Sequence, residues 1–201
     1  MRTSASVLIT RSIVVITALA LALGLSAMLR AAVPRAADAD NINVGQALRA
    51  GGFVIVVCHG ATFPDQTDTD LLNFDNNAAQ RSLNNKGKAL AKASGDSLRQ
   101  VGIPVGKVYT SKCNRAYETA VIAGFKNIEK TADLTEGGLV VSPNENNRPI
   151  EAFHKMLGTA PTPGTNIILI TQKPNMVDAL GMDWFDVKEG EASIFRPERP
   201  L

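Results

Sequence analysis

The chain has 201 residues, of which 45% are apolar and only two are cysteines, so it suits one domain of ordinary size and excludes a disulfide-held scaffold. The formal net charge is +2, and the positive excess lies in residues 1–39, which carry four arginines against one aspartate. The remaining chain holds 17 basic and 18 acidic side chains, and this near-neutral balance argues against a nucleic-acid partner.

Residues 12–29 form an uncharged apolar run between two arginines. The run just reaches the length of a membrane-spanning helix. It is also typical of a secretory signal, because arginines precede it and residues 37–39 (Ala-Asp-Ala) offer a cleavage site. Either way the sequence predicts export, to the periplasm or to the outer side of a membrane anchor. We divide the chain into residues 1–39, a signal peptide or membrane anchor with a linker, and residues 40–201, one domain.

The domain is expected to open with a short helix over residues 43–50 that Gly51 stops. Residues 53–58 (Phe-Val-Ile-Val-Val-Cys) predict a strand buried on both faces. The polar stretch 62–77 contains four aspartates, and its length inside a domain indicates a functional loop. A helix over residues 86–101 follows, with an expected inner side made of Leu90, Ala93, Ser97, Leu98 and Val101.

The second half of the chain continues with a short strand over residues 107–110 and a helix. Residues 139–142 predict another strand, and Pro149 is expected in the first turn of the helix after it. Residues 166–171 (Asn-Ile-Ile-Leu-Ile-Thr) predict the second fully apolar strand, and residues 192–195 are expected to close the sheet. The helix after strand 107–110 is expected to place four residues of helical spacing in the core, namely Tyr117, Ala120, Val121 and Phe125.

Strands that alternate with helices in this way are typical of an α/β domain with a parallel sheet. We therefore predict a three-layer α/β/α sandwich with a mostly parallel central sheet, preceded by the N-terminal apolar helix. His59 stands where the first buried strand ends. Ligands of open α/β sheets bind outside the carboxyl ends of the strands, so the position of this histidine indicates a site.

Three motifs carry further information: His59-Gly60-Ala61-Thr62, Gln80-Arg81-x-Leu83-x-x-x-Gly87 and Ser111-x-x-x-Arg115-Ala116-x-Glu118-Thr119-Ala120. In combination they resemble the histidine phosphatase (phosphoglycerate mutase-like) superfamily. The resemblance runs from about Gly45 to the Glu189-Gly190-Glu191-Ala192 stretch.

The resemblance implies that His59 is a nucleophile that accepts a phosphoryl group, because a neutral imidazole can attack phosphorus and divide one displacement into two. It also implies that Arg115 binds the phosphate oxygens and that Gly60 and Thr62 contact the substrate. Glu118 lies three residues beyond Arg115 and is expected either to orient that guanidinium or to act as the acid.

A carboxylic acid must protonate the leaving oxygen. Besides Glu118, Asp65 and Asp68 in the long loop are candidates, and the sequence does not choose between them.

Two positions depart from the pattern of the superfamily. Cys58 stands where the family has the arginine of an Arg-His-Gly motif, and Gln172 stands where the family has a second histidine. Both are expected at the substrate, but a thiol is a weak donor and an amide carries no charge. Lys112 and Lys173 neighbour these motifs and could restore some charge, although solvated loop lysines are the commoner case.

Other uses of the cysteines and histidines are less well supported. Cys58 cannot be the nucleophile of a cysteine phosphatase, because position 64 is Pro64 rather than the required arginine. An oxidising compartment would permit a Cys58–Cys113 disulfide, but the strand order of the family would put one strand between them. His154 is expected to be a partly exposed helical residue. Two histidines without ligand spacing give no indication of a metal, and no cofactor is expected.

The sequence thus predicts an exported protein of this superfamily that acts on or binds phosphate monoesters through His59, with impaired turnover. The alternative is a non-catalytic pseudophosphatase that binds a phosphorylated ligand or partner. A third and weaker hypothesis is a thiol-dependent role of Cys58. The expected partner is a small phosphorylated ligand, together with a membrane if the N-terminal segment is retained.

Overall fold

A five-stranded sheet forms the centre of the computed structural model, which describes residues 44–70, 73–135 and 143–197, the side chains of 143–147 excepted. The strand order is β3-β2-β4-β1-β5. Four strands are parallel, and β5 pairs antiparallel with β1 at one edge. The strands are β1 (Val54–Cys58), β2 (Val105–Ser111), β3 (Ile128–Thr131), β4 (Asn166–Thr171) and β5 (Ala192–Phe195).

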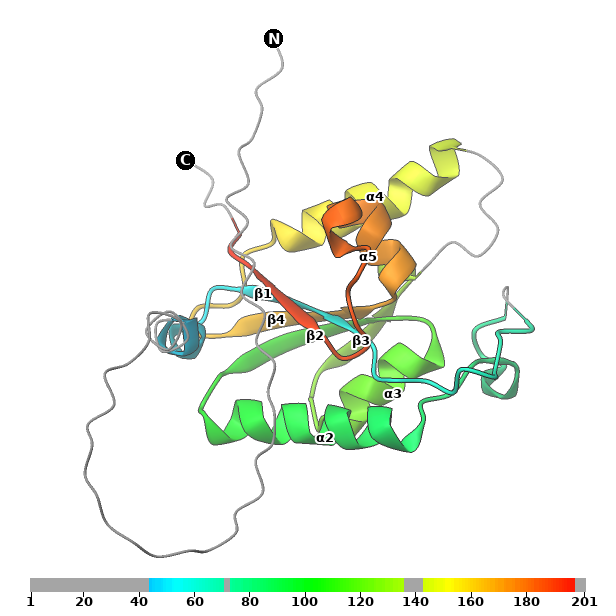
Figure 1. The fold of residues 1–201 in the computed structure, drawn as a ribbon. Helices are drawn as coiled ribbons and strands as arrows, with labels where there is room; N and C mark the ends of the chain where they lie inside the picture. Colours follow the sequence, from blue (N-terminus) through cyan, green and yellow to red (C-terminus); the bar gives the residue numbers. More distant parts are fainter. Residues whose placement is uncertain (1–43, 71–72, 136–142, 198–201) are drawn as a thin grey trace, which may run out of the picture.

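Helices cover both faces of the sheet, which gives the three layers that the sequence predicts (Figure 1). One face carries α4 (Pro143–Leu157) and α5 (Lys173–Leu180). The other face carries the helix over residues 44–50, α2 (Asn85–Gln100) and α3 (Asn114–Ile122). The described ranges also contain three single-turn 3₁₀-helices: η1 (Asn77–Ala79), η2 (Ala132–Leu134) and η3 (Met182–Trp184).

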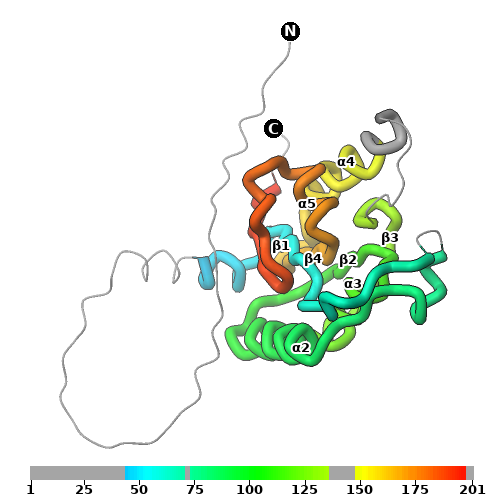
Figure 2. Tube along the Cα trace, turned by 45° about the vertical axis from the view of Figure 1, so that its right-hand side comes forward, coloured from blue at the N-terminus to red at the C-terminus, as the bar shows by residue number. Residues whose placement is uncertain are grey.

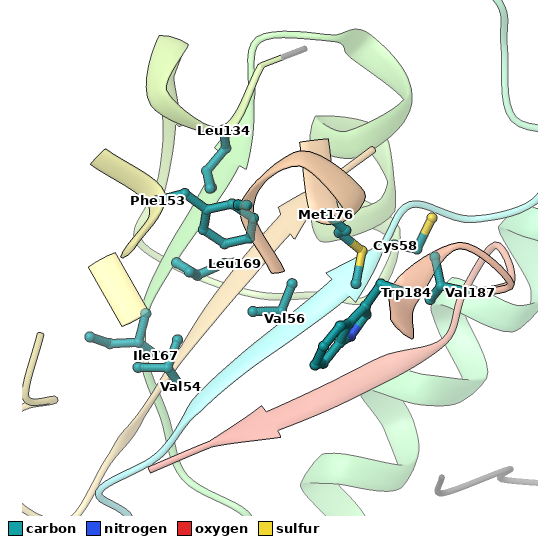
Figure 3. Packing of buried hydrophobic residues seen from close by; sticks show 11 residues of the cluster. Val54, Val56, Cys58, Leu134, Phe153, Ile167, Leu169, Met176, Trp184 and Val187 are labelled. Atoms are coloured by element: carbon teal, nitrogen blue, oxygen red, sulfur yellow. The ribbon is translucent and has the colours of Figure 1, made fainter. Parts of the chain in front are cut away.

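Alternate residues of the central strands feed two separate cores. Val54 and Val56 of β1 point to the α4–α5 side, whereas Ile55 points to the α2–α3 side. β4 alternates in the same way and is buried along its whole length. The two continuous apolar runs in the sequence therefore reflect burial on both faces. Figure 3 shows the α4–α5 core, whose buried members are Val54, Val56, Cys58, Leu134, Phe153, Ile167, Leu169, Met176, Ala179, Trp184 and Val187.

The predicted N-terminal apolar helix and its cleavage site lie in residues 1–43, outside the described residues. The same holds for the strand predicted over residues 139–142. Within the part of the chain that the structure describes, no helix is both long and apolar enough to cross a membrane.

The inner side of α2 matches the predicted one only in part: Leu98 packs against the core as expected, but the fully buried residues are others. Its buried residues are Gly87, Ala91 and Gly95, and Val101, just beyond its end, is 47% exposed. A β-carbon at Gly95 would lie 1.9 Å from the carbonyl oxygen of Ala123, which follows α3. The helix thus turns its small residues inward because α3 approaches too closely for a leucine stripe.

The predicted core face of α3 is also partly wrong. Ala120 is fully buried, but Val121 is 47% exposed. The buried face consists of Arg115, Ala116, Thr119 and Ala120, so two polar side chains occupy it. This rotation places the polar residues of α3 toward the carboxyl edge of the sheet instead of toward solvent.

Prolines account for two further differences. α4 begins at Pro143, so Pro149 lies inside the helix rather than in its first turn. The preference of proline for the first helical position is satisfied by Pro143 instead. The short helix α5 was not predicted, and Pro174 stands in its first turn. The edge strand β3 was also missed, because half of its four residues are charged.

We predict that Gly95→Ala lowers the free energy of unfolding by about 1–3 kcal/mol, because the added methyl group must push α2 away from α3 despite the higher helix propensity of alanine. Urea unfolding followed by circular dichroism measures this change. Gly45→Ala is the matched control, since a β-carbon there has no atom within 4 Å. Equal stability of the two variants would contradict the proposed contact.

Candidate active site

The carboxyl ends of three neighbouring parallel strands, β2, β4 and β1, meet at one edge of the sheet. His59 follows β1, Gln172 follows β4, and Ser111 ends β2. All three side chains are buried. This edge is where an open α/β sheet binds its ligands.

α3 brings Arg115 against His59. The Arg115 Nε donates to His59 Nε2 across 3.2 Å, and the arginine is only 1% exposed. A guanidinium group has no acceptor, so Nε2 is the unprotonated nitrogen of the ring. The proton therefore lies on Nδ1, which donates to the carbonyl oxygen of Gly60 at 2.8 Å. These two contacts hold a neutral imidazole whose Nε2 lone pair accepts from the guanidinium.

The environment of His59 keeps the imidazole neutral. Burial lowers the pKa of His59 from 6.5 to about 4, and the positive charges of Arg115 and Arg81 act in the same direction. The carbonyl of Gly60 and the carboxylate of Glu189 oppose this shift in pKa. At neutral pH the ring is therefore the uncharged form that a nucleophile requires.

Thr119 couples α3 to the segment that follows β1. Its hydroxyl group donates to the carbonyl oxygen of Arg115 at 2.7 Å and accepts from the N–H of Gly60 at 3.0 Å. Both backbone polar groups of Gly60 are thus used to position His59 and α3. Gly87 of α2 packs directly on this segment, since a β-carbon on Gly87 would lie 2.1 Å from the carbonyl oxygen of Ala61.

The loop between β1 and α2 contributes a carboxylate. Both oxygens of Asp68 accept from Arg115 Nη1, at 3.1 and 3.0 Å, and Oδ1 also accepts from the backbone N–H of Arg81 at 2.7 Å. Figure 2 shows this segment running outward alongside α3. Of the two loop aspartates considered as proton donors, Asp68 lies at the site, whereas Asp65 is exposed.

Arg81 brings a second guanidinium toward the site. Its Nε is buried and has no hydrogen-bond partner among the described residues, and its charge acts on His59. The preceding residue, Gln80, fixes the backbone, because its amide accepts from the N–H of Asn114 at 2.7 Å and donates to the carbonyl of Phe74 at 2.8 Å. Arg81 belonged to a recognised motif, but its role was not inferred from the sequence.

Gln172 is 1% exposed and lies immediately before α5. Its Nε2 contacts the hydroxyl group of Ser111 at 2.6 Å, and its Oε1 has no partner among the described residues. Rotation of the amide by half a turn would let Ser111 donate to Oε1 and leave the NH₂ group unpartnered. In either orientation one polar atom of this amide is available to a ligand.

Cys58 lies on the other side of the sheet from His59, as expected for successive residues of a strand. The thiol belongs to the core between β1 and α5, near Met176 and Val187 (Figure 3). Burial, followed by the negative charge of Glu189, raises the pKa of Cys58 to about 12. A thiolate is therefore absent at neutral pH, which argues against the thiol-dependent hypothesis.

Thr62 is tied to a carboxylate from the far end of the chain. Its hydroxyl group donates to Glu189 Oε1 at 2.8 Å, and its N–H lies 3.4 Å from Oε2. Gly190 donates its N–H to the carbonyl of His59 at 2.8 Å. The segment before β5 thus hydrogen-bonds to the backbone and side chains of the motif that begins at His59. It also brings Glu189 close enough to raise the pKa of His59.

The remaining sequence candidates have other partners or are exposed. Glu118 forms an ion pair with Lys88 at 3.2 Å, so it does not orient Arg115. Lys112 is exposed, and Lys173 Nζ lies over the ring of Phe185. His154 is exposed on α4, and its ring contacts the carbonyl of Ala179.

Neither a disulfide nor a metal centre is present in the described residues. Cys58 and Cys113 are both buried and form no disulfide; β4 lies between β1, which contains Cys58, and β2, which Cys113 follows, as the resemblance implies. No group of three or more histidine, cysteine or acidic side chains in the described ranges could hold a metal ion.

Comparison with known proteins supports the resemblance seen in the sequence. The model of the histidine phosphatase superfamily (branch 1) matches residues 54–141, which confirms the resemblance to this superfamily. The matched range contains His59, Arg81 and Arg115. No protein with a curated description matches the chain.

Solved structures of histidine phosphatases are similar to the chain at low identity. A putative phosphohistidine phosphatase SixA from Nakamurella multipartitia is 18% identical, with a TM-score of 0.44 over 63% of this chain and 62% of that one, which is less than two thirds of its length. The putative SixA from Agrobacterium tumefaciens is 14% identical, with a TM-score of 0.49 over 72% and 90% of the two chains. A mycobacterial glucosyl-3-phosphoglycerate phosphatase in complex with VO₃ is 13% identical, with a TM-score of 0.49 over 72% and 92%.

The lowered pKa of His59 predicts a specific pH dependence of stability. Because the unfolded chain binds a proton at this ring below about pH 6.5 and the folded chain does so only near pH 4, stability falls as the pH decreases through this range. The contribution amounts to about 3 kcal/mol. His59→Gln lacks the titrating group, so we expect the difference in unfolding free energy between the wild type and this variant to be larger at pH 7 than at pH 4.

Urea titrations of the two chains at several pH values measure this difference, and every other ionisable group is common to both. A difference that stays constant between pH 7 and pH 4 would mean that the ring is not held neutral by burial.

Proposed function

We propose that this protein is exported and binds phosphate monoesters at the carboxyl edge of its sheet, with His59 as the phosphoryl acceptor and with slow turnover. The observation that carries the proposal is the contact between Arg115 Nε and the unprotonated Nε2 of His59. A nucleophilic lone pair and a permanent positive charge then meet at one point. This combination suits attack on a phosphorus atom whose oxygens must be neutralised.

The chemistry follows from the positions of the groups. The Nε2 lone pair attacks phosphorus, the bond from phosphorus to the leaving oxygen breaks, and a carboxylic acid transfers its proton to that oxygen. Water then gives a proton back to the carboxylate and attacks phosphorus, the bond from phosphorus to Nε2 breaks, and inorganic phosphate leaves a neutral ring. Asp68 and Glu189 are the carboxyl groups near His59 and Arg115, but Asp68 is ion-paired with Arg115, so Glu189 is the proposed source of the proton. Glu118 is less suitable, since Lys88 holds it.

Slow turnover follows from the two replaced positions. Cys58 directs a protonated thiol into the core, and the Gln172 amide is engaged with Ser111. Losing one preorganised donor costs on the order of 10²–10³ in rate. The two losses need not multiply, because residues that act as a unit are strongly non-additive.

Arg81 offers partial compensation for the arginine that position 58 lacks. Its buried Nε has a free hydrogen, and its charge already acts on the His59 ring. The Arg81 guanidinium, which comes from the β1–α2 loop, can bind the same phosphate oxygens that an arginine at position 58 would bind. We therefore include Arg81 in the proposed anion-binding group with Arg115.

The second candidate function is a pseudophosphatase that binds a phosphorylated ligand without hydrolysing it. The burial of the Cys58 thiol in the apolar core favours this candidate. The superfamily has an arginine at position 58, and the buried thiol cannot replace the charged donor that this arginine would bring to the ligand. Anion binding needs only the guanidinium groups and the imidazole, whereas turnover also needs stabilisation of the transition state.

The proposal of export rests on the uncharged run of residues 12–29 and its arginine flanks. Fractionation of cells that express the chain with and without residues 1–39 would test it, since a full-length chain found only in the cytoplasm would exclude export.

Vanadate should protect the folded chain against heat. A ligand that binds only the native state stabilises it by about 2.7 kcal/mol at a hundredfold excess over Kd. Thermal unfolding with increasing vanadate or phosphate should show a rising Tm for the wild type and a smaller rise for Arg81→Gln. Lys126→Gln removes an equal charge at an exposed position and should behave as the wild type. The absence of any rise in the wild type would exclude an anion pocket.

Reversion of the replaced residues separates the two candidate functions. Cys58→Arg combined with Gln172→His should raise hydrolysis of a generic aryl phosphate by on the order of 10²-fold or more, if the protein is an impaired enzyme. His59→Ala in the reverted background should abolish this gain. A reverted chain that folds and binds vanadate but hydrolyses nothing would favour the pseudophosphatase. Rapid hydrolysis by the unmodified chain would contradict the proposal of slow turnover.

A further inference from the structure

The carboxylate of Asp68 lies among donors of the kind that bind phosphate. Its side chain is 18% exposed and forms an ion pair with Arg115, whose side chain is 1% exposed. One guanidinium N–H and one backbone N–H, from Arg81, point at its oxygens within 3.1 Å. Charge-assisted donors of these two types are also the ones that hold phosphoryl oxygens in proteins.

The same arginine joins this carboxylate to the proposed nucleophile. Arg115 Nε contacts His59 Nε2, while its Nη1 contacts Asp68. A phosphoryl group attacked by His59 must lie beside Nε2, and its oxygens must then reach the Arg115 guanidinium. The Asp68 carboxylate already uses part of that guanidinium.

We propose that Asp68 is an internal anion that occupies part of the phosphate-binding position, so that a ligand must displace its carboxylate from Arg115 and from the Arg81 N–H. This inference rests on the proposed function of the same site. It assigns Asp68 a role in specificity, which differs from the role of a proton donor.

The loop holds Asp68 close to Arg115, so its carboxylate competes with dissolved anions for this guanidinium as an intramolecular ligand. Gln66 Oε1 accepts from the N–H of Ser82 at 2.9 Å, and the N–H of Thr69 donates to the carbonyl of Ala79 at 2.8 Å. These bonds flank Asp68 and hold it near Arg115, so its effective concentration there is high. Weakly binding monoanions are thereby excluded. A phosphoryl dianion, with more charge and a third oxygen for Arg81, can replace it.

The test is the affinity of the full-length chain for inorganic vanadate and phosphate, measured by calorimetry for the wild type and for Asp68→Asn. The variant keeps the shape of the side chain and removes its charge. We expect the affinity of Asp68→Asn for vanadate to increase about ten-fold or more, the scale of a hydrogen bond to a charged group. Without ligand the variant should melt at a lower temperature, because Arg115 loses its ion pair, and vanadate should recover the loss.

Asp75→Asn is the matched control. It makes the same change in net charge at an exposed position of the same loop, so its affinity should stay that of the wild type. Asp68→Ser also removes the carboxylate and replaces the asparagine variant if that chain does not fold. Affinity for acetate should rise in the Asp68 variants as well, since a monoanion then meets no internal competitor.

The outcomes separate this inference from the function on which it rests. If the wild type and Asp68→Asn bind vanadate equally well and Arg81→Gln weakens both, the anion pocket exists and Asp68 is only a structural ion pair, which overturns the inference. If affinity falls in Asp68→Asn, the carboxylate helps to build the pocket and the inference is again wrong. If neither folded chain binds vanadate, the proposed function itself fails and the inference with it.

Discussion

The buried guanidinium of Arg115 is the group on which the site depends. Removing a positive charge from water costs several kcal/mol unless the charge is paired and hydrogen-bonded. At 1% exposure, Arg115 meets this cost with the ring nitrogen of His59 and the carboxylate of Asp68. Three elements far apart in the sequence therefore have to converge at one point: the end of β1, the long loop and the first turn of α3.

This convergence explains the unusual packing around it. α3 turns Arg115 and Thr119 inward, so its apolar residues cannot all be buried, and Val121 remains at the surface. α2 in turn approaches through glycines, because there is no room for larger side chains beside Ala61 and Ala123. The arrangement of two helices thus follows from the placement of one charged residue.

The two replaced positions have different structural consequences. At position 58 the side chain has joined the apolar core, and its thiol stays protonated because burial raises its pKa. At position 172 a polar group remains at the sheet edge and still has one unpartnered atom. Arg81 supplies a charge from a different element. Under the proposed function, a pocket of this composition holds an anion but lacks part of what accelerates phosphoryl transfer.

Much of the fold could be predicted from the sequence, because local patterns encode it. Continuous apolar runs identified β1 and β4, which are buried on both faces, and three motifs in combination indicated the superfamily. The edge strand β3 and the helix α5 were not predicted, because segments this short and of mixed polarity show no hydrophobic period. Pro149 was predicted in the first turn of its helix, but the first turn of α4 contains Pro143 instead.

What only the tertiary structure decided is which polar groups meet. The sequence named Asp65 and Asp68 as equal candidates and gave Arg81 no role, because spacing along a loop does not determine where a side chain points. It placed Glu118 next to Arg115 on the same helix, yet the rotation of α3 gives that carboxylate to Lys88. Contacts between groups 47 or 56 residues apart arise from packing, and packing is a property of the whole chain rather than of any segment.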